Sequence, residues 1–530
     1  MLKRTVTLLG VLALLVALAT PTAAIAAPDR GDDGDHGASG GHGRHTLEAY
    51  ARDTWRSFVH MTHPRTGLPA DNIGGDLRTR TRAAYTSPTN VGMYLWATLA
   101  ARDLGLVRGR DAVERIDKAL DSLEQLERHE PSGQFYNWYD PASLDKLTVW
   151  PVDGSTVHPF LSSVDNGWLA SALLMVADAV PQLDDRASDL AASMNFGCYY
   201  DPAAKGAPPG LIRGGFWVVG DEPPGSEGFP SDDYCGMGET VVYTGHHYGA
   251  FNTEPRIASY IGIAQGQIPP EHYYAGWRTF PDTCDWSWPE AKPVGEWRTY
   301  GGVEVFEGAY RYDDQLVVPT WGGSMFEALM PALVVPEEEW GPDSWAVTHP
   351  LYVEAQREFG LEEAGYGYWG FSPASDPAGG YREYGVDAIG MEPNGYTADV
   401  QRQTLVDTGW DDQACPRPAT PTTEYGEGVV TPHAAFLALD FERGAALDNL
   451  ARLRADFPGL YGRGGFKDTV NVATGRVADR YLALDQGMVI AAIANELLDD
   501  RLQGYLADTL QPELEPLMAV EEFGAGRVQP

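Results

Sequence analysis

The chain has 530 residues, and its 75 acidic residues outnumber its 38 lysines and arginines, which gives a formal net charge of −37. A surface this acidic argues against nucleic acid or an anionic polymer as a partner and favours a neutral one. No Pro-rich or Ser-rich linker interrupts the residues that follow Thr46. We therefore expect one large domain over residues 46–530.

The N-terminus has the pattern of an export signal. Lys3 and Arg4 precede the apolar stretch Leu8–Leu18, and Ala24-Ile25-Ala26 offers a small-residue cleavage site. We predict a signal peptide at residues 1–26, followed by a disordered, acidic, Gly-rich linker at 27–45. No later segment reaches the length of a membrane span, so we expect no transmembrane segment in the mature chain, which would be secreted or held at the cell envelope.

Helical periodicity dominates the rest of the chain, because apolar residues recur at intervals of three and four. The predicted helices are Leu47–Met61, Pro88–Leu104, Asp111–Leu126, Val164–Val180, Asp184–Asn195, Glu254–Ala264, Pro270–Trp277, Met325–Leu333, Thr348–Phe359, Pro432–Leu439, Glu442–Leu453 and Leu484–Leu498. Twelve helices in successive pairs predict an all-α fold, an (α/α)6 barrel with long aromatic-rich loops. An irregular all-α domain or an open solenoid are the alternatives.

Three long segments, Tyr199–Tyr243, Pro281–Tyr312 and Gly365–Gly428, lack this periodicity and are rich in Gly, Pro, Trp and Tyr. We interpret them as ordered functional loops. Aromatic rings such as Trp138 and Trp369 could offer flat faces to sugar rings, although such rings also serve as ordinary packing.

The four cysteines, Cys198, Cys235, Cys284 and Cys415, form an even set in an exported chain. This predicts two disulfides, with three possible pairings. Their spacing fits no zinc template. We expect no metal and no cofactor.

Acidic residues recur at predicted helix starts. Asp165 follows Ser162 and Ser163, either of which is a candidate N-cap, and Glu254 follows Thr253, a third candidate N-cap. Negative charge favours first turns on its own account, because of the helix dipole. The same pattern occurs at Glu327 and Asp485, and in a ring of parallel inner helices all four carboxylates would gather in one pocket. Paired carboxylates, one protonated and one ionised, are what glycosidic hydrolysis needs.

Several motifs, in order along the chain, resemble the bacterial glucoamylase-like family, which includes secreted endo-β-1,2-glucanases and a region of the cyclic β-1,2-glucan synthases. They are Thr86-Ser87-Pro88-Thr89-Asn90-Val91-Gly92-Met93-Tyr94-Leu95, Phe135-Tyr136-Asn137-Trp138-Tyr139, Ser163-Val164-Asp165-Asn166, Glu254-Pro255-Arg256-Ile257-Ala258-Ser259, Gly323-Ser324-Met325-Phe326-Glu327-Ala328-Leu329-Met330-Pro331, Trp369-Gly370-Phe371-Ser372, Tyr461-Gly462-Arg463-Gly464-Gly465-Phe466 and Leu484-Asp485-Gln486-Gly487.

The resemblance implies an (α/α)6 barrel and a glycoside hydrolase with an inverting mechanism. It also implies that Glu254 is the general acid. Asp165 is our candidate for the water-activating base, with Glu327 and Asp485 as alternatives.

The expected substrate is a neutral polysaccharide or oligosaccharide, with β-1,2-glucan as one candidate. We predict substrate contacts from six side chains: Asn166, Arg256, Glu327, Trp369, Asp485 and Trp138. We expect a monomer. The alternative hypothesis is a non-catalytic carbohydrate-binding or cell-envelope protein on the same scaffold.

Overall fold

The computed structural model describes residues 36–204, 209–281, 291–391 and 425–528. Residues Arg44–Pro530 form one compact unit, which holds every helix and strand from β1 onward. The predicted signal peptide, and the predicted linker as far as residue 35, lie outside the described residues. The last part of that linker is helical, because α1 begins at His36; the apolar repeat that signals a helix in the sequence begins only at Leu47.

The α-helices of the described residues follow the predicted order closely. They are α1 His36–Met61, α2 Pro88–Asp103, α3 Gly109–Leu123, α4 Ser163–Ala179, α5 Asp184–Ala192, α6 Arg256–Ala264, α7 Met325–Leu329, α8 Glu337–Trp340, α9 Trp345–Glu358, α10 Pro432–Leu437, α11 Leu439–Asp456, α12 Ala483–Leu498 and α13 Arg501–Met518. The prediction at Pro270–Trp277 corresponds to a shorter 3-10 helix, Pro270–Tyr274. Helices α8 and α13 were not predicted.

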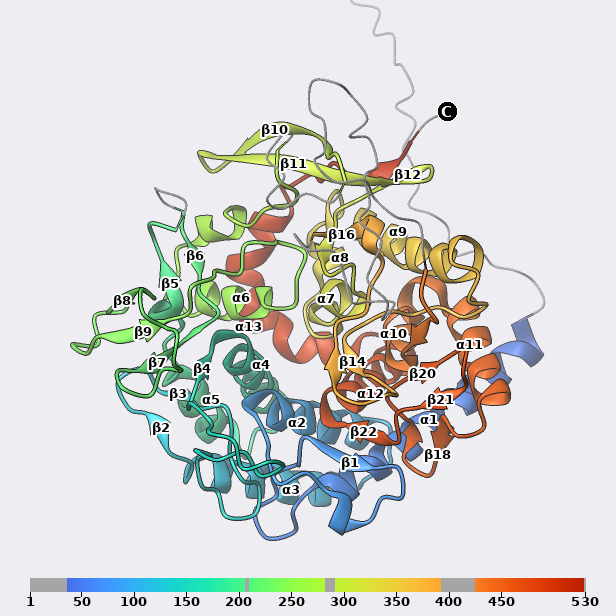
Figure 1. Cartoon of the computed structure of the whole chain (residues 1–530), viewed down its shortest axis with the longest axis horizontal. Coiled ribbons are helices and arrows are strands. Elements are labelled where there is room, and N and C mark those ends of the chain that lie inside the picture. Colours follow the sequence, from blue (N-terminus) through green and yellow to red (C-terminus); the bar gives the residue numbers. More distant parts are fainter. Residues whose placement is uncertain (1–35, 205–208, 282–290, 392–424, 529–530) are drawn as a thin grey trace, which may run out of the picture. The chain divides into compact units, whose positions relative to one another are not determined.

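Six of these helices follow one another around the centre of Figure 1. Helix α6 packs on α4, α4 on α2, α2 on α12, α12 on α10, and α10 on α7. Helices α2 and α4 are buried along almost their whole length, as expected of helices that are apolar on every side. Glycines allow their close approach, because a Cβ at Gly92 would lie 2.8 Å from the carbonyl oxygen of Trp168 and one at Gly167 would lie 3.0 Å from Ala258.

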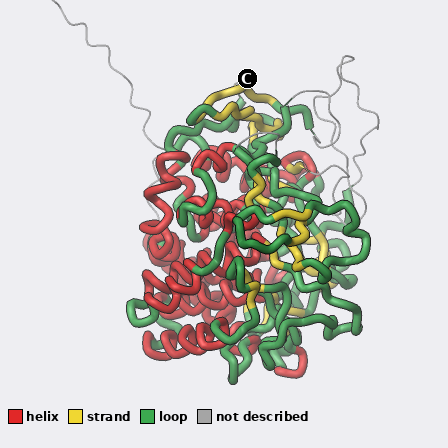
Figure 2. The backbone as a smooth tube through the Cα atoms, turned by 90° about the vertical axis from the view of Figure 1, so that its left-hand side faces the viewer, coloured by secondary structure: helices red, strands yellow, loops and turns green. Residues whose placement is uncertain are grey.

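Short strands join these helices. Their sheets are β1 Asn72–Gly74 with β22 Arg480–Leu482; β2 Arg128–His129 with β3 Gln134–Phe135; β4 Leu161–Ser162, β7 Gly215–Val218, β9 Val241–Tyr243 and β8 Ser231–Asp232; β5 Tyr200–Asp201 with β6 Leu211–Ile212; β10 Val294–Tyr300, β11 Val303–Tyr312, β12 Gln315–Val317 and β23 Gly526–Arg527; β13 Thr320–Trp321 with β16 Gly390–Met391; β14 Ala374–Ser375 with β15 Tyr381–Arg382; β17 Val429–Val430, β20 Val470–Asn471 and β21 Arg476–Val477; and β18 Tyr461–Gly462 with β19 Gly465–Phe466. Figure 2 shows helices gathered on one side and most strands and loops on the other.

The interpretation of the three aromatic segments as loops is therefore incomplete. Residues 199–243 contribute strands β5 to β9, and the segment from Pro281 to Tyr312 contains the antiparallel hairpin β10–β11. Most of these strands have only two to four residues, too few for an alternating pattern to be visible in the sequence. Strands β4 and β22 end directly before α4 and α12, while one residue separates β17 from α10 and three residues separate β13 from α7.

One of the two predicted disulfides is present, between Cys198 and Cys235. It ties the segment with strands β5 to β9 to the end of the 3-10 helix Phe196–Tyr199. Cys284 and Cys415 lie outside the described residues. Among the described residues, no helix combines the length and the apolar character needed to span a bilayer.

Candidate active site

Two of the predicted helix-start carboxylates are placed by serine N-caps. The Ser162 hydroxyl accepts a hydrogen bond from the backbone N–H of Asp165 at 3.2 Å, and the Ser324 hydroxyl accepts one from Glu327 at 3.3 Å. Ser162, not Ser163, is therefore the cap of α4. Each cap thus fixes a carboxylate in the first turn of its helix, Asp165 in α4 and Glu327 in α7.

Glu254 is positioned differently from the prediction. Helix α6 begins at Arg256 with Pro255 at its N-cap position, so Glu254 precedes the first turn. Thr253 is not a cap. Its hydroxyl instead donates to Oε2 of Glu327, because a hydrogen bond to a carboxylate is charge-assisted and therefore stronger than one between neutral groups.

Asp165, Glu254 and Glu327 all line one cleft, which has about 2180 Å³ of open space. The cleft also receives side chains from the starts of α2 and α12, among them Thr89 and Leu484. The N-terminal ends of α2, α4, α6, α7 and α12 thus contribute to one site, which gathers three of the four predicted carboxylates.

Glu254 and Glu327 are in direct contact but differ in their hydrogen bonds. The backbone N–H of Glu254 donates to Oε2 of Glu327 at 2.8 Å, beside the Thr253 hydroxyl. Burial raises the pKa of Glu327 to about 7, although these two donors oppose the shift. Burial and then the charge of Glu327 raise the pKa of Glu254 well above its ordinary value, against the opposing effect of the Trp168 indole N–H, which donates to its Oε2. Burial and the neighbouring charge therefore favour the protonated form of Glu254, through its raised pKa.

Asp165 supplies the third carboxylate. The hydroxyl of Thr89 donates to its Oδ1 at 2.6 Å, and Asp165 remains partly exposed in the cleft. Burial is the main cause of the raised pKa of Glu254, and the charge of Asp165 adds to it. The two carboxyl groups therefore interact electrostatically. A carboxyl group with a raised pKa, that of Glu254, and a partly exposed one, that of Asp165, thus line one cavity.

Aromatic rings form one wall of the cleft. The ring centroid of Tyr85 lies 4.5 Å from that of Trp150 and 5.6 Å from that of Trp138, and all three side chains line the cavity. Trp138 is therefore located where the sequence predicted a substrate contact. Flat apolar faces beside polar groups suit a sugar ring.

Four other predicted substrate contacts do not line the cleft. The Asn166 side chain is buried and spans the backbone N–H and carbonyl of Phe135, and Trp369 is 1% exposed inside the core. Arg256 is buried in an ion pair with Glu337. Asp485 is 1% exposed and lies outside the cavity lining. For Asn166, Arg256 and Asp485 the sequence pattern located the helix start but not the direction of the side chain, whereas Trp369 lies in an irregular segment outside the helices.

The cleft includes residues that the sequence did not single out: Asp71, Tyr381, Arg382, Glu383 and Arg480. Asp71 accepts hydrogen bonds from the amides of Asn72 and Asn90, and burial raises its pKa nonetheless. All five lie in strands or loops without helical periodicity. The one sequence feature near them that points to the cleft is Asn90, a polar residue in the first turn of α2, whose backbone N–H donates to the N-cap Ser87.

A buried cluster of His433, Asp468 and Asp485 is the one group within the described ranges with the spacing to hold a metal ion, since one ligand atom from each lies within 4.8 Å of the others. Burial lowers the pKa of His433 to about 3, and burial together with the charge of Asp468 raises that of Asp485 well above its ordinary value. The same arrangement is explained without a metal ion if the His433 imidazole is neutral and Asp468 and Asp485 share one proton. The sequence predicted no metal, and these three residues come from separate segments.

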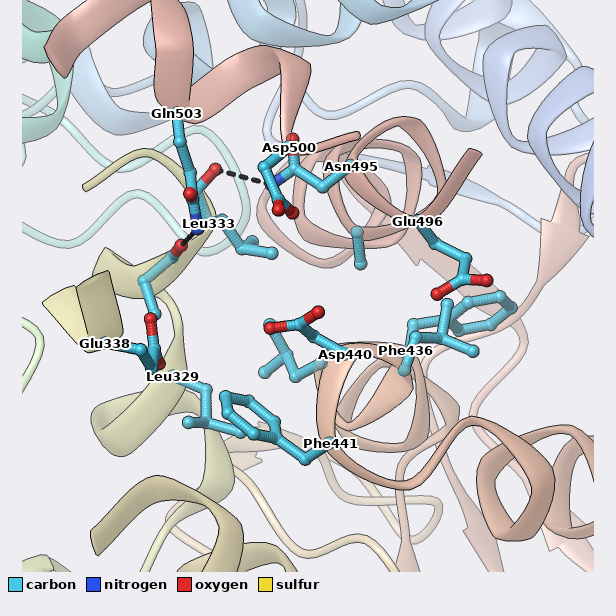
Figure 3. A pocket seen from close by; sticks show the side chains of 14 residues that line it. Leu329, Leu333, Glu338, Phe436, Asp440, Phe441, Asn495, Glu496, Asp500 and Gln503 are labelled. Carbon is cyan, nitrogen blue, oxygen red and sulfur yellow. Dashed lines mark hydrogen bonds between the residues drawn. The ribbon is translucent and has the colours of Figure 1, made fainter. Parts of the chain in front are cut away.

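A second pocket lies at the C-terminal ends of α7, α10 and α12 (Figure 3). Its walls combine apolar side chains from the last turns of α7 and α10, such as Leu329 and Phe436, with carboxylates such as Asp440 and Glu496. None of the predicted site residues lines it. Of the two pockets, only the first cleft is lined by predicted site residues.

Comparisons with known proteins place this helical fold and its carboxylate-lined cleft beside glucoamylase-like proteins. Residues 293–507 match the family described as "Putative glucoamylase", and residues 49–198 match a family described as a protein of unknown function (DUF3131). The chain is 22% identical, over 87% of its length, to the cyclic β-(1,2)-glucan synthase NdvB of Rhizobium meliloti, and it spans 18% of that relative. The resemblance predicted from the sequence is confirmed.

Solved structures share the fold. An endo-β-1,2-glucanase from Chitinophaga pinensis, in complex with sophorotriose and glucose, has a TM-score of 0.60 at 15% identity, over 89% of this chain and 98% of that one. An endo-β-1,2-glucanase from Talaromyces funiculosus with sophorose has a TM-score of 0.61 at 13% identity, over 90% and 88% of the two chains. A protein described as a putative glucoamylase, from Bacteroides caccae, has a TM-score of 0.59 at 17% identity, over 91% and 100%. The two glucanases are glycoside hydrolases, and this is the enzyme class predicted from the sequence.

Proposed function

We propose that this chain is a glycoside hydrolase that cleaves a neutral glucan, and that its substrate is β-1,2-linked. The observation that carries the proposal is the cleft in which Glu254 keeps its proton beside Glu327 and Asp165. Glycosidic hydrolysis needs a protonated carboxyl group and an ionised one on either side of the scissile bond. The β-1,2 linkage is supported by the glucanases and the glucan synthase to which the chain is similar.

In the proposed mechanism, Glu254 donates its proton to the glycosidic oxygen as the bond to the anomeric carbon breaks. The Trp168 indole N–H then stabilises the carboxylate that Glu254 becomes. Asp165 takes a proton from the water that attacks the anomeric carbon from the opposite face, so the configuration inverts. Glu327, which accepts two hydrogen bonds, stays ionised near neutral pH more readily than Glu254 and keeps that acid protonated.

The aromatic wall and the scarcity of basic residues in the cleft favour an uncharged sugar chain. Tyr85, Trp138 and Trp150 offer stacking faces, while Asp71 and Asp165 offer acceptors for hydroxyl groups. The many carboxylates in the lining would repel an anionic polysaccharide.

We further propose that the six helices α2, α4, α6, α7, α10 and α12 are the inner ring of an (α/α)6 barrel, with the domain running over residues 46–530. Export of the protein is supported by the Cys198–Cys235 disulfide, since such bonds persist in oxidising compartments. N-terminal sequencing of the secreted protein should find cleavage near Ala26.

The test is a panel of β-1,2-, β-1,3-, β-1,4- and α-1,4-glucans incubated with the full mature chain, with reducing ends measured over time. We expect release from β-1,2-glucan, and proton NMR at early times should show products of the α configuration, as inversion requires. Binding of β-1,2-glucan without any release from the panel would instead identify a non-catalytic carbohydrate-binding protein.

A further inference from the structure

Arg256 uses every N–H of its guanidinium group inside the protein. Nε and Nη2 donate to the two carboxylate oxygens of Glu337 at 2.7 and 2.8 Å. Nη1 donates to the carbonyl oxygens of Thr253 at 3.0 Å and Glu327 at 2.9 Å, and Nη2 donates to that of Ala328 at 2.6 Å. These contacts account for all five donors of an arginine, so none remains for a substrate.

The surroundings of this ion pair are equally complete. Arg256 is 4% exposed and Glu337 is fully buried. The Tyr260 hydroxyl donates to Oε1 of Glu337 at 2.8 Å, and the guanidinium lies 4.7 Å from the ring centroid of Trp345. A buried charge pair with this many satisfied hydrogen bonds holds one geometry.

The three carbonyl groups that Arg256 binds belong to the two segments that carry the neighbouring glutamates of the cleft. Thr253 immediately precedes Glu254, while Glu327 and Ala328 lie in α7. The same two segments meet again at the Glu327 carboxylate, which accepts from the Thr253 hydroxyl and the Glu254 N–H. Arg256 therefore joins a second time the two segments that already meet at the Glu327 carboxylate.

We propose that Arg256 is a positioning residue that fixes the Glu254 segment against the start of α7, and thereby sets the contact of the Glu254 backbone N–H with the Glu327 carboxylate and the separation of the two carboxyl groups. The proposal rests on the proposed function insofar as Glu254 is the acid. It assigns Arg256 a role in the site without any contact to the sugar.

Arg256→Lys tests whether the site needs the hydrogen-bond geometry of the guanidinium group or only its positive charge. A lysine keeps the positive charge but offers three donors from one point and cannot span a carboxylate and three carbonyl groups at once. We expect kcat to fall by roughly 100-fold, since a misplacement of about 1 Å has that effect, with KM within a few-fold of wild type.

The same variant should shift the pH profile. The charge of Glu327 and burial both raise the pKa of Glu254. A loosened contact weakens both effects, so Glu254 should lose its proton at lower pH. The alkaline limb of the kcat profile should therefore move to lower pH in Arg256→Lys.

Arg278→Lys is a matched control. Arg278 is also fully buried, is paired with Glu521, and has its guanidinium 3.6 Å from the ring centroid of Phe251. Its guanidinium donates to the Gly276 carbonyl and to Glu521, which lie outside the Glu254 segment and α7. We expect Arg278→Lys to lower the melting temperature about as much as Arg256→Lys but to leave the pH profile in place.

Equal kcat values and equal pH profiles for the two lysine variants would overturn the proposal. A chain that hydrolyses no glucan would contradict only the proposed function, because the positioning role has a readout without catalysis. In ¹³C-glutamate-labelled protein, the carboxyl resonance of Glu254, assigned by its loss in Glu254→Gln, should titrate at lower pH in Arg256→Lys than in wild type. An unchanged titration would refute the positioning role.

Discussion

Glu254 and Glu327 illustrate how two side chains of one type come to hold their protons differently. Glu327 accepts two hydrogen bonds on one oxygen, which stabilise its ionised form. Glu254 accepts from the Trp168 indole, and lies beside the charge of Glu327, which favours its neutral form. Pairs of carboxyl groups with separated pKa values are how enzymes assign acid and base.

Trp168→Phe should move the alkaline limb of the activity profile to higher pH. The indole N–H stabilises the ionised form of Glu254 and so lowers its pKa; without it the pKa rises further. Turnover should also fall by about 10-fold, since the carboxylate formed after proton transfer loses a donor. Kinetics between pH 4 and 10 test this.

Trp96→Phe is the control for that experiment. Trp96 is fully buried and packs against Trp168 with 5.5 Å between ring centroids, and its indole nitrogen has no hydrogen-bond partner among the described residues. Its replacement changes packing but not the hydrogen bonding of Glu254. An equal shift in both variants would contradict the role given to the Trp168 N–H.

Asp165→Asn tests the base. If Asp165 activates water, the amide cannot take the proton and turnover should fall by roughly 10²–10⁴-fold with substrate binding retained. The measurement is kcat alongside the affinity for an uncleaved oligosaccharide. A variant with nearly normal turnover would transfer the base role to Glu327, the third of the predicted carboxyl groups that line the cleft.

The sequence located the three carboxyl groups at or just before helix starts and the ring of Trp138, and it missed the cleft residues in strands and loops such as Asp71 and Arg480. Asp165, Glu327 and Trp138 reach the cleft as predicted, but Asn166 follows Asp165 on the helix and its side chain therefore points elsewhere, into the core. A motif identifies a position along the chain. Which side of a helix faces the cleft depends on how the helix packs in the fold. The cleft wall also includes segments such as β14–β15, whose sequences show no helical periodicity.

At the scale of elements, the N-cap of α4 links stability to the site. Ser162 is 4% exposed and its hydroxyl accepts the Asp165 N–H. We expect Ser162→Ala to lower the free energy of unfolding by about 1 kcal/mol, the usual cost of losing a serine cap. Urea denaturation measures this, with Ser143→Ala in an exposed turn as the control, for which less than about 0.5 kcal/mol is expected. Equal effects would argue against the cap.

Helices were predicted well because a long apolar repeat leaves a strong pattern, whereas two-residue strands leave none. Helix α13 was missed because Pro512 and Pro516 lie inside it and proline normally ends a helix. The hairpin β10–β11 does carry a local signal, since Gly301 and Gly302, both with positive φ, form its two-residue turn.

At the scale of the whole molecule, buried carboxyl groups should make the fold less stable as pH rises. Glu307 is 1% exposed, neither of its carboxylate oxygens has a hydrogen-bond partner among the described residues, and burial raises its pKa from 4.5 to about 8. Between those values the folded state holds a proton that the unfolded state has lost, so stability is full below pH 4.5 and declines through pH 8.

Glu307→Gln removes this titration. We expect the melting temperature of the variant to fall less steeply than that of wild type between about pH 5 and 8, with little difference at lower pH. One such group contributes up to about 1.4 kcal/mol per pH unit. Glu304→Gln, exposed on the same strand, should keep the wild-type slope. Parallel curves for all three proteins would contradict the burial argument.

The central claim is that Glu254 is the acid of a glucan-cleaving site, and Glu254→Gln tests it most directly. Glutamine keeps the shape and the hydrogen bond from Trp168 but has no proton to donate. On the glucan that wild type cleaves, the rate of reducing-end release should fall by about 10²–10⁴-fold with binding retained. A rate within a few-fold of wild type would contradict the account.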